Sequence, residues 1–283
     1  MGSYLVNWGI VGCNLAATNI AFNLHRLQRH IGAVADQNYL SAIRFAKEQM
    51  VMQALPVRDL LNDQQIDAIF LADAIGNQQE IVKTALLEHK SVLYDQLGQI
   101  SLTDLRALQR LASNEHVLLF PNLPTAAMPL LAKLKQKELN ISSIQTYFAA
   151  DANLTVFIPT VAALLVGLGL PIVRLKLTNA NSSQISFTLE NTQIEMLHTN
   201  DTELLENAVI TTSSRQLLLT SVFAPAKLQQ YPLTDQPAKE VGDGSKATQY
   251  LLQAFENHLS EEIFPPNWAH LSSKVLNLKK QLL

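Results

Sequence analysis

A short apolar run with small residues at its turn, NWGIVGCNLAA at residues 7–17, has the residue types of a nucleotide-binding loop. In the frame G-x-G-x-x-G/A, the first small residue makes a tight turn. The second lets a pyrophosphate approach the backbone, and the third lets a helix pack on a strand. These positions are Gly12, Asn14 and Ala17 in this chain. Because phosphate also favours the N–H groups that begin the following helix, the spacing predicts a dinucleotide-binding loop with one departure.

Asn14 is the departure. Asparagine tolerates a left-handed backbone better than most residues with a Cβ, so we expect the turn itself to form. Its side chain occupies space that a pyrophosphate needs, although its carboxamide can also donate hydrogen bonds to a phosphate. Retained binding and a purely structural turn both stay open at this point, because a strand-turn-helix needs a glycine-like corner with or without a ligand.

Asp36 adds an acidic group 24 positions beyond Gly12, at the end of the second expected strand. An acid about 20 residues beyond such a turn binds the ribose hydroxyls and disfavours a 2′-phosphate. We therefore expect NAD(H) or NADP(H) as the cofactor, with NAD(H) preferred. The residues expected to hold it are Gly12, Cys13, Asn14, Leu15, Asp36 and Ala72.

The elements that must position these residues alternate between strand and helix over the first 120 residues. Short apolar runs predict strands at 4–12, 31–36, 68–73, 91–95 and 116–121, with helical patterns between them. Strands that are apolar throughout need helices on both faces of their sheet. The fold class is therefore α/β, with a Rossmann-like doubly wound parallel sheet in a domain of residues 1–122.

The second half of the chain, residues 123–283, has a different pattern. A helix at 128–139 precedes a strand at 143–150 and an apolar helix. Strands then follow one another directly at 173–180, 183–190, 192–200, 207–213 and 214–223, and helices at 242–259 and 268–283 end the chain. Consecutive strands favour an antiparallel sheet, so we predict an α+β domain with a mostly antiparallel sheet. We expect copies of the chain to associate into a homo-oligomer through the open face of this sheet.

Composition excludes several classes of function. Hydrophobic residues make up 48% of the chain and the net charge is −3, so nothing indicates binding to nucleic acid. Cys13 is the single cysteine and no leader pattern precedes it, so we expect a cytoplasmic protein. The uncharged segment 155–173 is nearly long enough to cross a membrane, but it contains prolines and glycines. We expect it to form a buried helix that Gly169 and Pro171 end.

Other residues offer little chemistry. Cys13, at a helix N-terminus, has two interpretations: a reactive thiol with a lowered pKa, or a packed cysteine, which its apolar neighbours favour. His198 lies near Asp201 and Glu203, but TNDTE is more simply a solvated hairpin turn. No histidine or cysteine spacing predicts a metal site, and a small molecule is the ligand we expect.

Four segments of the first half resemble the Gfo/Idh/MocA oxidoreductase family (glucose-fructose oxidoreductase and inositol dehydrogenase). NWGIVGCNLAA resembles the opening W-G-I-x-G-x-G-x-I-A, and GAVADQNYLSAIRFAKE is similar to A-V-A-D-R-D with A-x-x-F-A. PVRDLLNDQQIDAIFLAD resembles the stretch leading to I-D-A-V-Y-I-A-T-P, and ALLEHKSVLYDQL resembles A-L-x-A-G-K-H-V-L-C-E-K-P. The resemblance covers about 150 residues and implies an NAD(P)-dependent oxidoreductase of a sugar, polyol or related small metabolite.

The chemically demanding positions of that family differ in this chain. The lysine of E-K-P, commonly assigned a role in proton transfer, falls on Gln96, and the glutamate falls on Asp95. The T-P pair falls on Asp73 and Ala74, and a histidine a few residues later falls on Gln78. The family's second-domain signature G-x-H-x-x-D has no counterpart in FIPTVAALLVGLG.

The lost lysine matters because oxidation of an alcohol requires removal of the hydroxyl proton, and a positioned base contributes ~10²–10⁴-fold to the rate. Gln96 forms hydrogen bonds but does not accept that proton. Tyr94 and Asp95 are nearby, without a pose that assigns either of them, so the catalytic residues are not predicted. Two functions stay open: an oxidoreductase with degenerate motifs, or a catalytically inactive relative that acts as a small-molecule sensor or interaction subunit.

Overall fold

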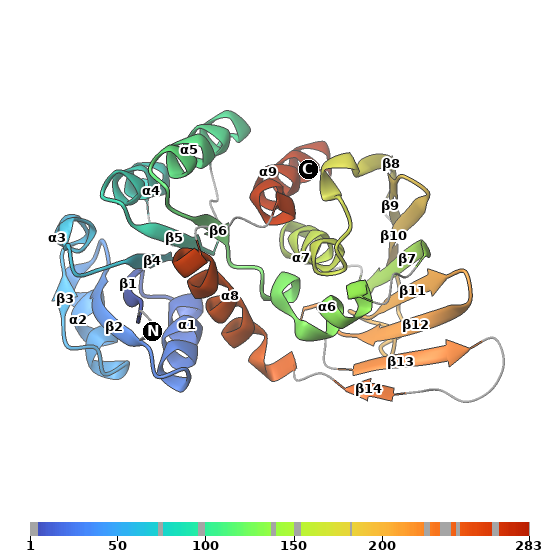
Figure 1. Ribbon diagram of the computed structural model, residues 1–283, viewed down its shortest axis with the longest axis horizontal. Helices are drawn as coiled ribbons and strands as arrows, with labels where there is room; N and C mark the ends of the chain where they lie inside the picture. Colours follow the sequence, from blue (N-terminus) through green and yellow to red (C-terminus); the bar gives the residue numbers. More distant parts are fainter. Residues whose placement is uncertain are drawn as a thin grey trace. The chain divides into compact units, whose positions relative to one another are not determined.

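The computed structural model describes residues 5–72, 76–95, 100–136, 140–149, 154–181, 183–223, 227–232, 239–241, 244–261 and 266–282. The chain forms two compact units, coloured along the sequence in Figure 1. One unit comprises Met1–Asn122 with Leu252–Phe264, and the other comprises Leu123–Leu251 with Pro265–Leu283. The first unit thus includes a segment that the sequence interpretation assigned to the second domain.

The first unit contains a six-stranded parallel sheet with the order β3-β2-β1-β4-β5-β6. Its strands are β1 (Asn7–Val11), β2 (His30–Ala35), β3 (Ala54–Leu55), β4 (Ala68–Leu71), β5 (Ser91–Tyr94) and β6 (Leu119–Pro121). The predicted doubly wound sheet is confirmed. The sequence interpretation did not include β3, which has only two residues.

Helices connect these strands in order: α1 (Leu15–Arg26), α2 (Tyr39–Glu48), α3 (Val57–Asn62), α4 (Gln78–Leu87) and α5 (Leu102–Asn114). The strand order runs in one direction from β1 to β3 and in the other from β4 to β6. Right-handed crossovers therefore place α1 and α2 on one face of the sheet and α4 and α5 on the other. Both faces are covered, which explains why the central strand β4 is buried at each of its four residues.

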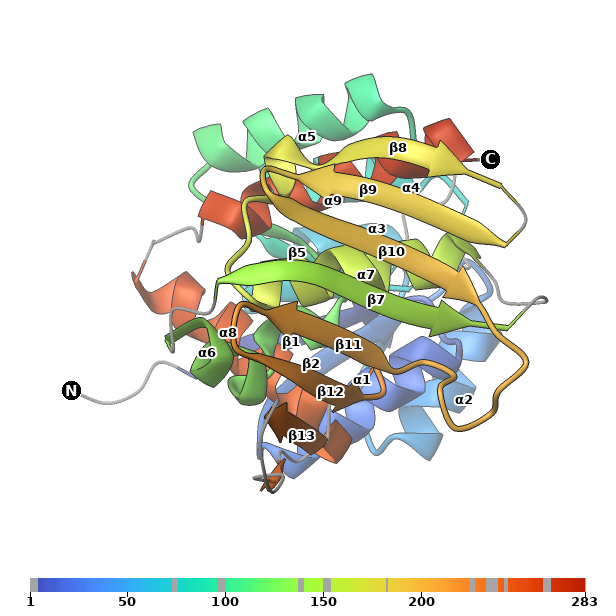
Figure 2. The same ribbon diagram turned by 90° about the vertical axis from the view of Figure 1, so that its right-hand side faces the viewer.

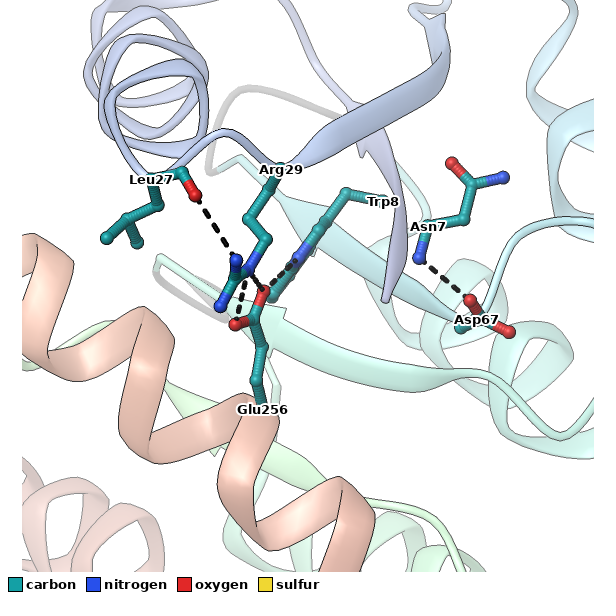
Figure 3. A network of polar contacts seen from close by, with 6 residues as sticks. All are labelled: Asn7, Trp8, Leu27, Arg29, Asp67 and Glu256. Atoms are coloured by element: carbon teal, nitrogen blue, oxygen red, sulfur yellow. Dashed lines mark hydrogen bonds and ion pairs between the residues drawn. The ribbon is translucent and has the colours of Figure 1, made fainter. Parts of the chain in front are cut away.

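The helix segment 252–261 joins the first unit through a buried polar contact (Figure 3). Glu256 accepts a hydrogen bond from Trp8 Nε1 at 3.1 Å and pairs with Arg29, whose Nε lies 2.8 Å from Oε2. The ring of Phe255 packs against Trp8 with centroids 5.3 Å apart and against Phe120 with centroids 6.0 Å apart. Partners that lie far apart in the chain, such as Trp8 and Glu256 at 248 positions, leave no local sequence signal. This is why the predicted domain boundary missed the segment.

The second unit contains a mixed sheet with the order β14-β13-β12-β11-β7-β10-β9-β8. Its described strands are β7 (Ile141–Phe148), β8 (Lys176–Ala180), β9 (Gln184–Leu189), β10 (Thr192–His198), β11 (Ala208–Thr212), β12 (Arg215–Thr220), β13 (Lys227–Pro232) and β14 (Lys239–Val241). Neighbouring strands are antiparallel except for the pair β7 and β10. The predicted mostly antiparallel sheet is confirmed, whereas β13 and β14 were not predicted.

The helical segments of this unit are η1 (Pro124–Ala127), α6 (Pro129–Gln136), α7 (Leu154–Gly167), η2 (Ile172–Arg174), η3 (Gly244–Lys246), the start of α8 (Ala247–Glu261), and α9 (Pro266–Leu282). Figure 2 shows the strands facing the viewer, with α7 and α9 behind them. The inward residues of β7 and β10, such as Ile144 and Met196, are fully buried in one core with α7. The other face carries part-exposed residues such as Gln145, Tyr147 and Glu195.

Two local expectations in this unit have opposite outcomes. Residues 157–166 of α7 are all buried, and the turn after the helix contains Gly169 with a φ of 79°, so the predicted buried helix is confirmed. No helix in the described part of the chain has the length and apolarity to cross a membrane.

The predicted hairpin at TNDTE is wrong, because β10 and β11 both pair with β7 and lie on opposite sides of it. Residues 199–207 therefore cross over β7.

Candidate nucleotide-binding site

The turn after β1 depends on Gly12. Its φ is 96°, a conformation that side chains with a Cβ rarely adopt. The N–H of Gly12 donates to the carbonyl of Ala35 at 2.8 Å, which joins the turn to the end of β2. The chain then enters α1 at Leu15. Gly12 therefore forms the tight turn that the sequence frame predicted for it.

Asp36 lies directly beside this turn. Its Oδ2 accepts a hydrogen bond from the backbone N–H of Cys13 at 2.9 Å, and its Oδ1 accepts one from the N–H of Asn38 at 2.9 Å. Two residues predicted to bind the same cofactor thus touch each other. A carboxylate held by two backbone donors is fixed in position beside the loop, with part of its surface exposed.

Asn14 does not use the left-handed backbone that asparagine tolerates. Its φ of −113° and ψ of −173° are extended, and the turn forms as expected. Asn14 is instead the N-cap of α1, because its Oδ1 accepts a hydrogen bond from Ala17 N at 3.0 Å. An N-cap residue requires an extended backbone, and this requirement decides the conformation. The side chain therefore occupies one of the helix N–H donors that could otherwise face a phosphate.

The remaining predicted residues differ in what they offer. Leu15 begins α1 and is 84% exposed, so its backbone N–H lies at the open end of the helix. The N–H groups of Leu15 and Ala16 have no acceptor among the described residues. Ala72 is fully buried and its N–H donates to the carbonyl of Val11 at 2.9 Å, so it supports the end of β1 from the β4 side.

Cys13 is a packed thiol. Burial, together with the negative charge and hydrogen bond of Asp36, raises its pKa from 9.0 to about 12. Its Sγ lies 3.9 Å from the carbonyl of Ala35. The direction of this pKa shift contradicts the reactive interpretation, which required a lowered pKa, and the half-buried position beside Ala35 and Asp36 favours the packed one.

A second polar group lies at the ends of β5 and β6. Asp95 follows β5 and Asn122 follows β6, and Asn122 Nδ2 donates to Asp95 Oδ1 at 2.9 Å. Asn122 Oδ1 is buried and has no hydrogen-bond partner among the residues that the structure describes. Sequence reasoning singled out Asp95 and missed Asn122. The available signal was its place immediately after the last predicted strand, because the carboxyl ends of neighbouring parallel strands meet at one edge.

The other positions changed from the family pattern are less informative. Gln78 is the first residue of α4, after Asn77 in a left-handed conformation with a φ of 58°. Asp73, Ala74 and Gln96 lie outside the described residues. Within the described ranges, no group of three or more histidine, cysteine, aspartate or glutamate side chains could hold a metal ion.

The loop has most of the groups that a dinucleotide needs. Gly12 makes the corner, Leu15 and Ala16 offer N–H donors to a phosphate, and the Asp36 carboxylate is placed where ribose hydroxyls would bind. Asn14 removes one donor without closing the turn. The residues present therefore fit the cofactor, with one phosphate contact fewer than an uncapped helix would give.

Comparison with known proteins identifies the class of this unit. Residues 6–123 match the model of the GFO_IDH_MocA family, described as an oxidoreductase family with an NAD-binding Rossmann fold. The first unit therefore carries the NAD-binding Rossmann domain of this family, which confirms the resemblance of its motifs. None of the curated proteins compared with the chain matches it.

Solved structures extend the similarity of fold to the second unit. The 3-ketoreductase KijD10 from Actinomadura kijaniata, in complex with TDP-benzene and NADP, is 16% identical with a TM-score of 0.78, over 99% of this chain and 97% of that one. The dehydrogenase MviM from Clostridium difficile is 13% identical with a TM-score of 0.80, over 98% of both chains. The UDP-N-acetylglucosamine 3-dehydrogenase GnnA from Acidithiobacillus ferrooxidans is 15% identical with a TM-score of 0.78, over 99% and 97%.

Proposed function

We propose that the protein is an NAD(P)-dependent oxidoreductase that acts on a sugar, a sugar nucleotide, a polyol or a related small metabolite, with NAD(H) preferred. The observation that carries the proposal is the joining of the Gly12 turn to Asp36 through Cys13 N–H, in a domain of an NAD-binding family. Sugar nucleotides enter the proposal because two proteins of similar fold are described as a 3-ketoreductase with TDP-benzene and a UDP-N-acetylglucosamine 3-dehydrogenase.

The preference for NAD(H) is argued from charge. The Asp36 carboxylate accepts hydrogen bonds from ribose hydroxyls, whereas a 2′-phosphate would place like charges together. No basic side chain contacts Asp36 among the hydrogen bonds of the described residues, since both of its donors are backbone N–H groups. When bound, the nicotinamide would supply the hydride chemistry. The chain's own contributions are the Gly12 corner, two phosphate-facing N–H groups and the ribose-binding carboxylate.

The test is a titration of the purified protein with NADH and with NADPH, followed by energy transfer from tryptophan and by thermal shift. We expect binding of NADH in the micromolar range and weaker binding of NADPH. Absence of any shift at millimolar concentrations of both would overturn the proposal, because an enzyme of this class must hold its hydride donor.

A double variant, Asn14→Gly with Gln96→Lys, separates altered function from lost function. It restores the family residues at the phosphate loop and at the lysine position. If the wild type binds NADH and the double variant binds more tightly and gains activity, the native site is a weakened form of the family site. If only the double variant binds, the native chain has lost the cofactor.

A catalytically inactive homologue, acting as a small-molecule sensor or interaction subunit, is the second candidate. It is favoured by the cap that Asn14 places on α1 and by Gln96 at the position of the family lysine. Binding of NADH without turnover of any substrate in a panel of sugars, UDP- and TDP-sugars and inositols would support this candidate over the first.

We also propose that two copies associate through the open face of the second sheet. On the part-exposed face around Gln145, Tyr147 and Glu195, the Glu195 carboxylate is already paired, since Gln145 Nε2 and Gln184 Nε2 each donate to it at 2.8 Å. A face with satisfied polar groups can be covered at little desolvation penalty. Light scattering after gel filtration should give a dimer mass, and Tyr147→Lys should shift it to a monomer. A monomeric wild type at high micromolar concentration would contradict this.

A further inference from the structure

Asn122 holds a buried hydrogen-bond acceptor that no described residue satisfies. Its Oδ1 has no donor within the described part of the chain, while its Nδ2 donates to Asp95 Oδ1 at 2.9 Å. An unpaired buried acceptor is destabilising, so a folded protein that keeps one needs a reason for it. A ligand group that supplies the missing hydrogen-bond donor would be such a reason.

The orientation of the Asn122 amide follows from Asp95. Oxygen and nitrogen of an amide are assigned from their partners, and an ionised carboxylate only accepts hydrogen bonds. Turning the amide round would place Asn122 Oδ1 against Asp95 Oδ1, where two acceptors repel. The carboxylate therefore fixes Nδ2 toward itself and leaves Oδ1 as the unpaired atom.

The backbone around the pair is held firmly. Asp95 N–H donates to the carbonyl of Leu71 at 2.9 Å, and Asn122 N–H donates to the carbonyl of Tyr94 at 2.7 Å. Both bonds continue the ladder of the parallel sheet beyond the last paired residues, Tyr94 and Pro121. The pair thus lies on the carboxyl edge of the sheet, where open α/β sheets bind their ligands. Asp95 is part-exposed, so it can exchange a proton with solvent.

We propose that Asp95 receives the hydroxyl proton of the substrate, and that Asn122 positions Asp95 and accepts a hydrogen bond from a ligand hydroxyl through Oδ1. The inference rests on the proposed oxidoreductase function. It answers the loss of the family lysine, because Gln96 has no group that takes up a proton at neutral pH.

The step is the oxidation of a secondary alcohol of a sugar. The O–H bond of the substrate breaks and its proton goes to the Asp95 carboxylate. The electron pair of that bond forms the second carbon–oxygen bond of the ketone. The hydrogen on the carbon leaves with its electron pair to the oxidised nicotinamide dinucleotide that the proposed function requires. Solvent then takes the proton from Asp95.

The first experiment compares Asp95→Asn with a matched control, Asp67→Asn. Asp67 also carries a carboxylate that accepts a hydrogen bond, from Asn7 N at 2.8 Å, but it precedes β4 at the opposite edge of the sheet (Figure 3). We expect Asp95→Asn to bind NADH within threefold of wild type and to oxidise its best substrate, from a panel of UDP- and TDP-sugars, hexoses and inositols, ~10²–10⁴-fold more slowly. Asp67→Asn should match the wild type in both.

Two further variants separate proton transfer and positioning from a structural role. Sodium formate should restore part of the activity of Asp95→Ala, since a small carboxylate can enter the vacated space. Asn122→Leu should lower kcat more than tenfold while leaving the Kd of NADH unchanged. Unchanged turnover in Asp95→Asn would overturn the inference and leave the proposed function standing.

A readout that does not depend on turnover uses protein labelled with ¹⁵N at asparagine. The Asn122 side-chain signals, assigned by their absence in Asn122→Leu, should move when the best-binding sugar or sugar nucleotide is added with NAD⁺. The Asn23 side-chain signals should stay in place. Unmoved Asn122 signals at saturating sugar would overturn the inference. A wild type that binds NADH but oxidises nothing in the panel would overturn the inference and the oxidoreductase function together, in favour of the inactive homologue. A wild type that binds no NADH would overturn the proposed cofactor site itself, whereas unchanged turnover in Asp95→Asn overturns the inference alone.

Discussion

The two ends of the carboxyl edge of the first sheet treat their polar groups differently. Beside β1 and β2, Asp36 has two backbone donors and Asn14 caps α1, so these acceptors find partners within the chain. Beside β5 and β6, Asn122 Oδ1 is buried and receives no hydrogen bond from any described residue. Satisfied polar groups make a region rigid, whereas an unpaired one marks a place that a ligand group completes. We infer that the chain itself organises the end beside β1 and β2, where we propose that the ribose binds (the ribose end). The end beside β5 and β6, where we propose that proton transfer takes place (the proton-transfer end), is left for the substrate to complete.

The largest effect on stability is expected at Glu256. Its substitution measures how much free energy of unfolding is lost when a fully satisfied buried acceptor is removed. Glu256→Ala leaves Trp8 Nε1–H and the Arg29 guanidinium without their acceptor, at a site where the glutamate side chain is 8% exposed. Breaking a buried ion pair on one side is destabilising by about 3–5 kcal/mol, and we expect about 2–4 kcal/mol because Arg29 is 26% exposed. Urea unfolding measures this change.

Glu115→Ala is the control for that measurement. The pair of His89 and Glu115, with 3.5 Å between Nδ1 and Oε2 and a histidine side chain that is 72% exposed, should contribute less than about 1 kcal/mol. If the two variants lost equal stability, the buried contact would have no special weight, and the contrast between satisfied and unpaired groups would fail.

The next largest effect is expected at Asp36. Asp36→Ser removes the carboxylate that disfavours a 2′-phosphate, so the ratio of NADPH affinity to NADH affinity should rise about tenfold or more, which corresponds to ~1.4 kcal/mol. Fluorescence titration with both cofactors measures the ratio. Asp59→Ser, an exposed carboxylate in α3, should leave the ratio as it is. An unchanged ratio in Asp36→Ser would mean that Asp36 serves only the loop.

A smaller effect is expected at Asn14. Asn14→Ala removes the cap from Ala17 N–H and should destabilise the protein by ~1 kcal/mol. The same change frees a donor for the pyrophosphate, so NADH should bind two- to tenfold more tightly, the range of one net hydrogen bond at ~0.5–1.5 kcal/mol. Asn14→Ser keeps a cap and should stay near the wild type in both. Tighter binding by Asn14→Ser and not by Asn14→Ala would show that side-chain size, rather than the occupied donor, sets affinity.

The sequence predicted the arrangement of residues beside β1 and β2 well, because its parts follow from local patterns. A strand, a glycine corner and a helix lie within one stretch, and Asp36 comes at the end of the next strand, so a single βαβ unit brings it to Cys13. What the pattern could not decide was the backbone at Asn14. A left-handed turn and an N-cap both favour asparagine, and only the geometry of α1 shows that the cap determines it.

The arrangement beside β5 and β6 was predicted less well, because its residues are far apart in the sequence and come together only in the folded sheet. Asp95 and Asn122 lie 27 positions apart on strands whose neighbourhood depends on the whole sheet order. The return of residues 252–261 to the first unit depends on Glu256 meeting Arg29, 227 positions away, and no periodicity encodes that distance. The same cause explains the wrong hairpin at TNDTE, since crossing over β7 is decided by the position of β7 between its neighbours.

The smallest effect is expected at Cys13, and it tests whether the ribose end is closed as tightly as the hydrogen bonds indicate. The contact with Asp36 uses the backbone N–H, so Cys13→Ala should bind NADH as the wild type does and lose less than about 1 kcal/mol at pH 7. The pKa of the thiol is raised from 9.0 to about 12 in the folded protein, so the stability that this adds is fully present below pH 9 and is lost as the pH rises toward 12. Urea unfolding between pH 7 and 10.5 should therefore show the wild type losing more stability than Cys13→Ala.

Labelling of Cys13 by iodoacetamide at pH 8 should be on the order of a hundredfold slower in the native than in the urea-unfolded protein. Equal labelling rates would place the thiol in open solvent, and the ribose end would then be as incomplete as the end at Asn122.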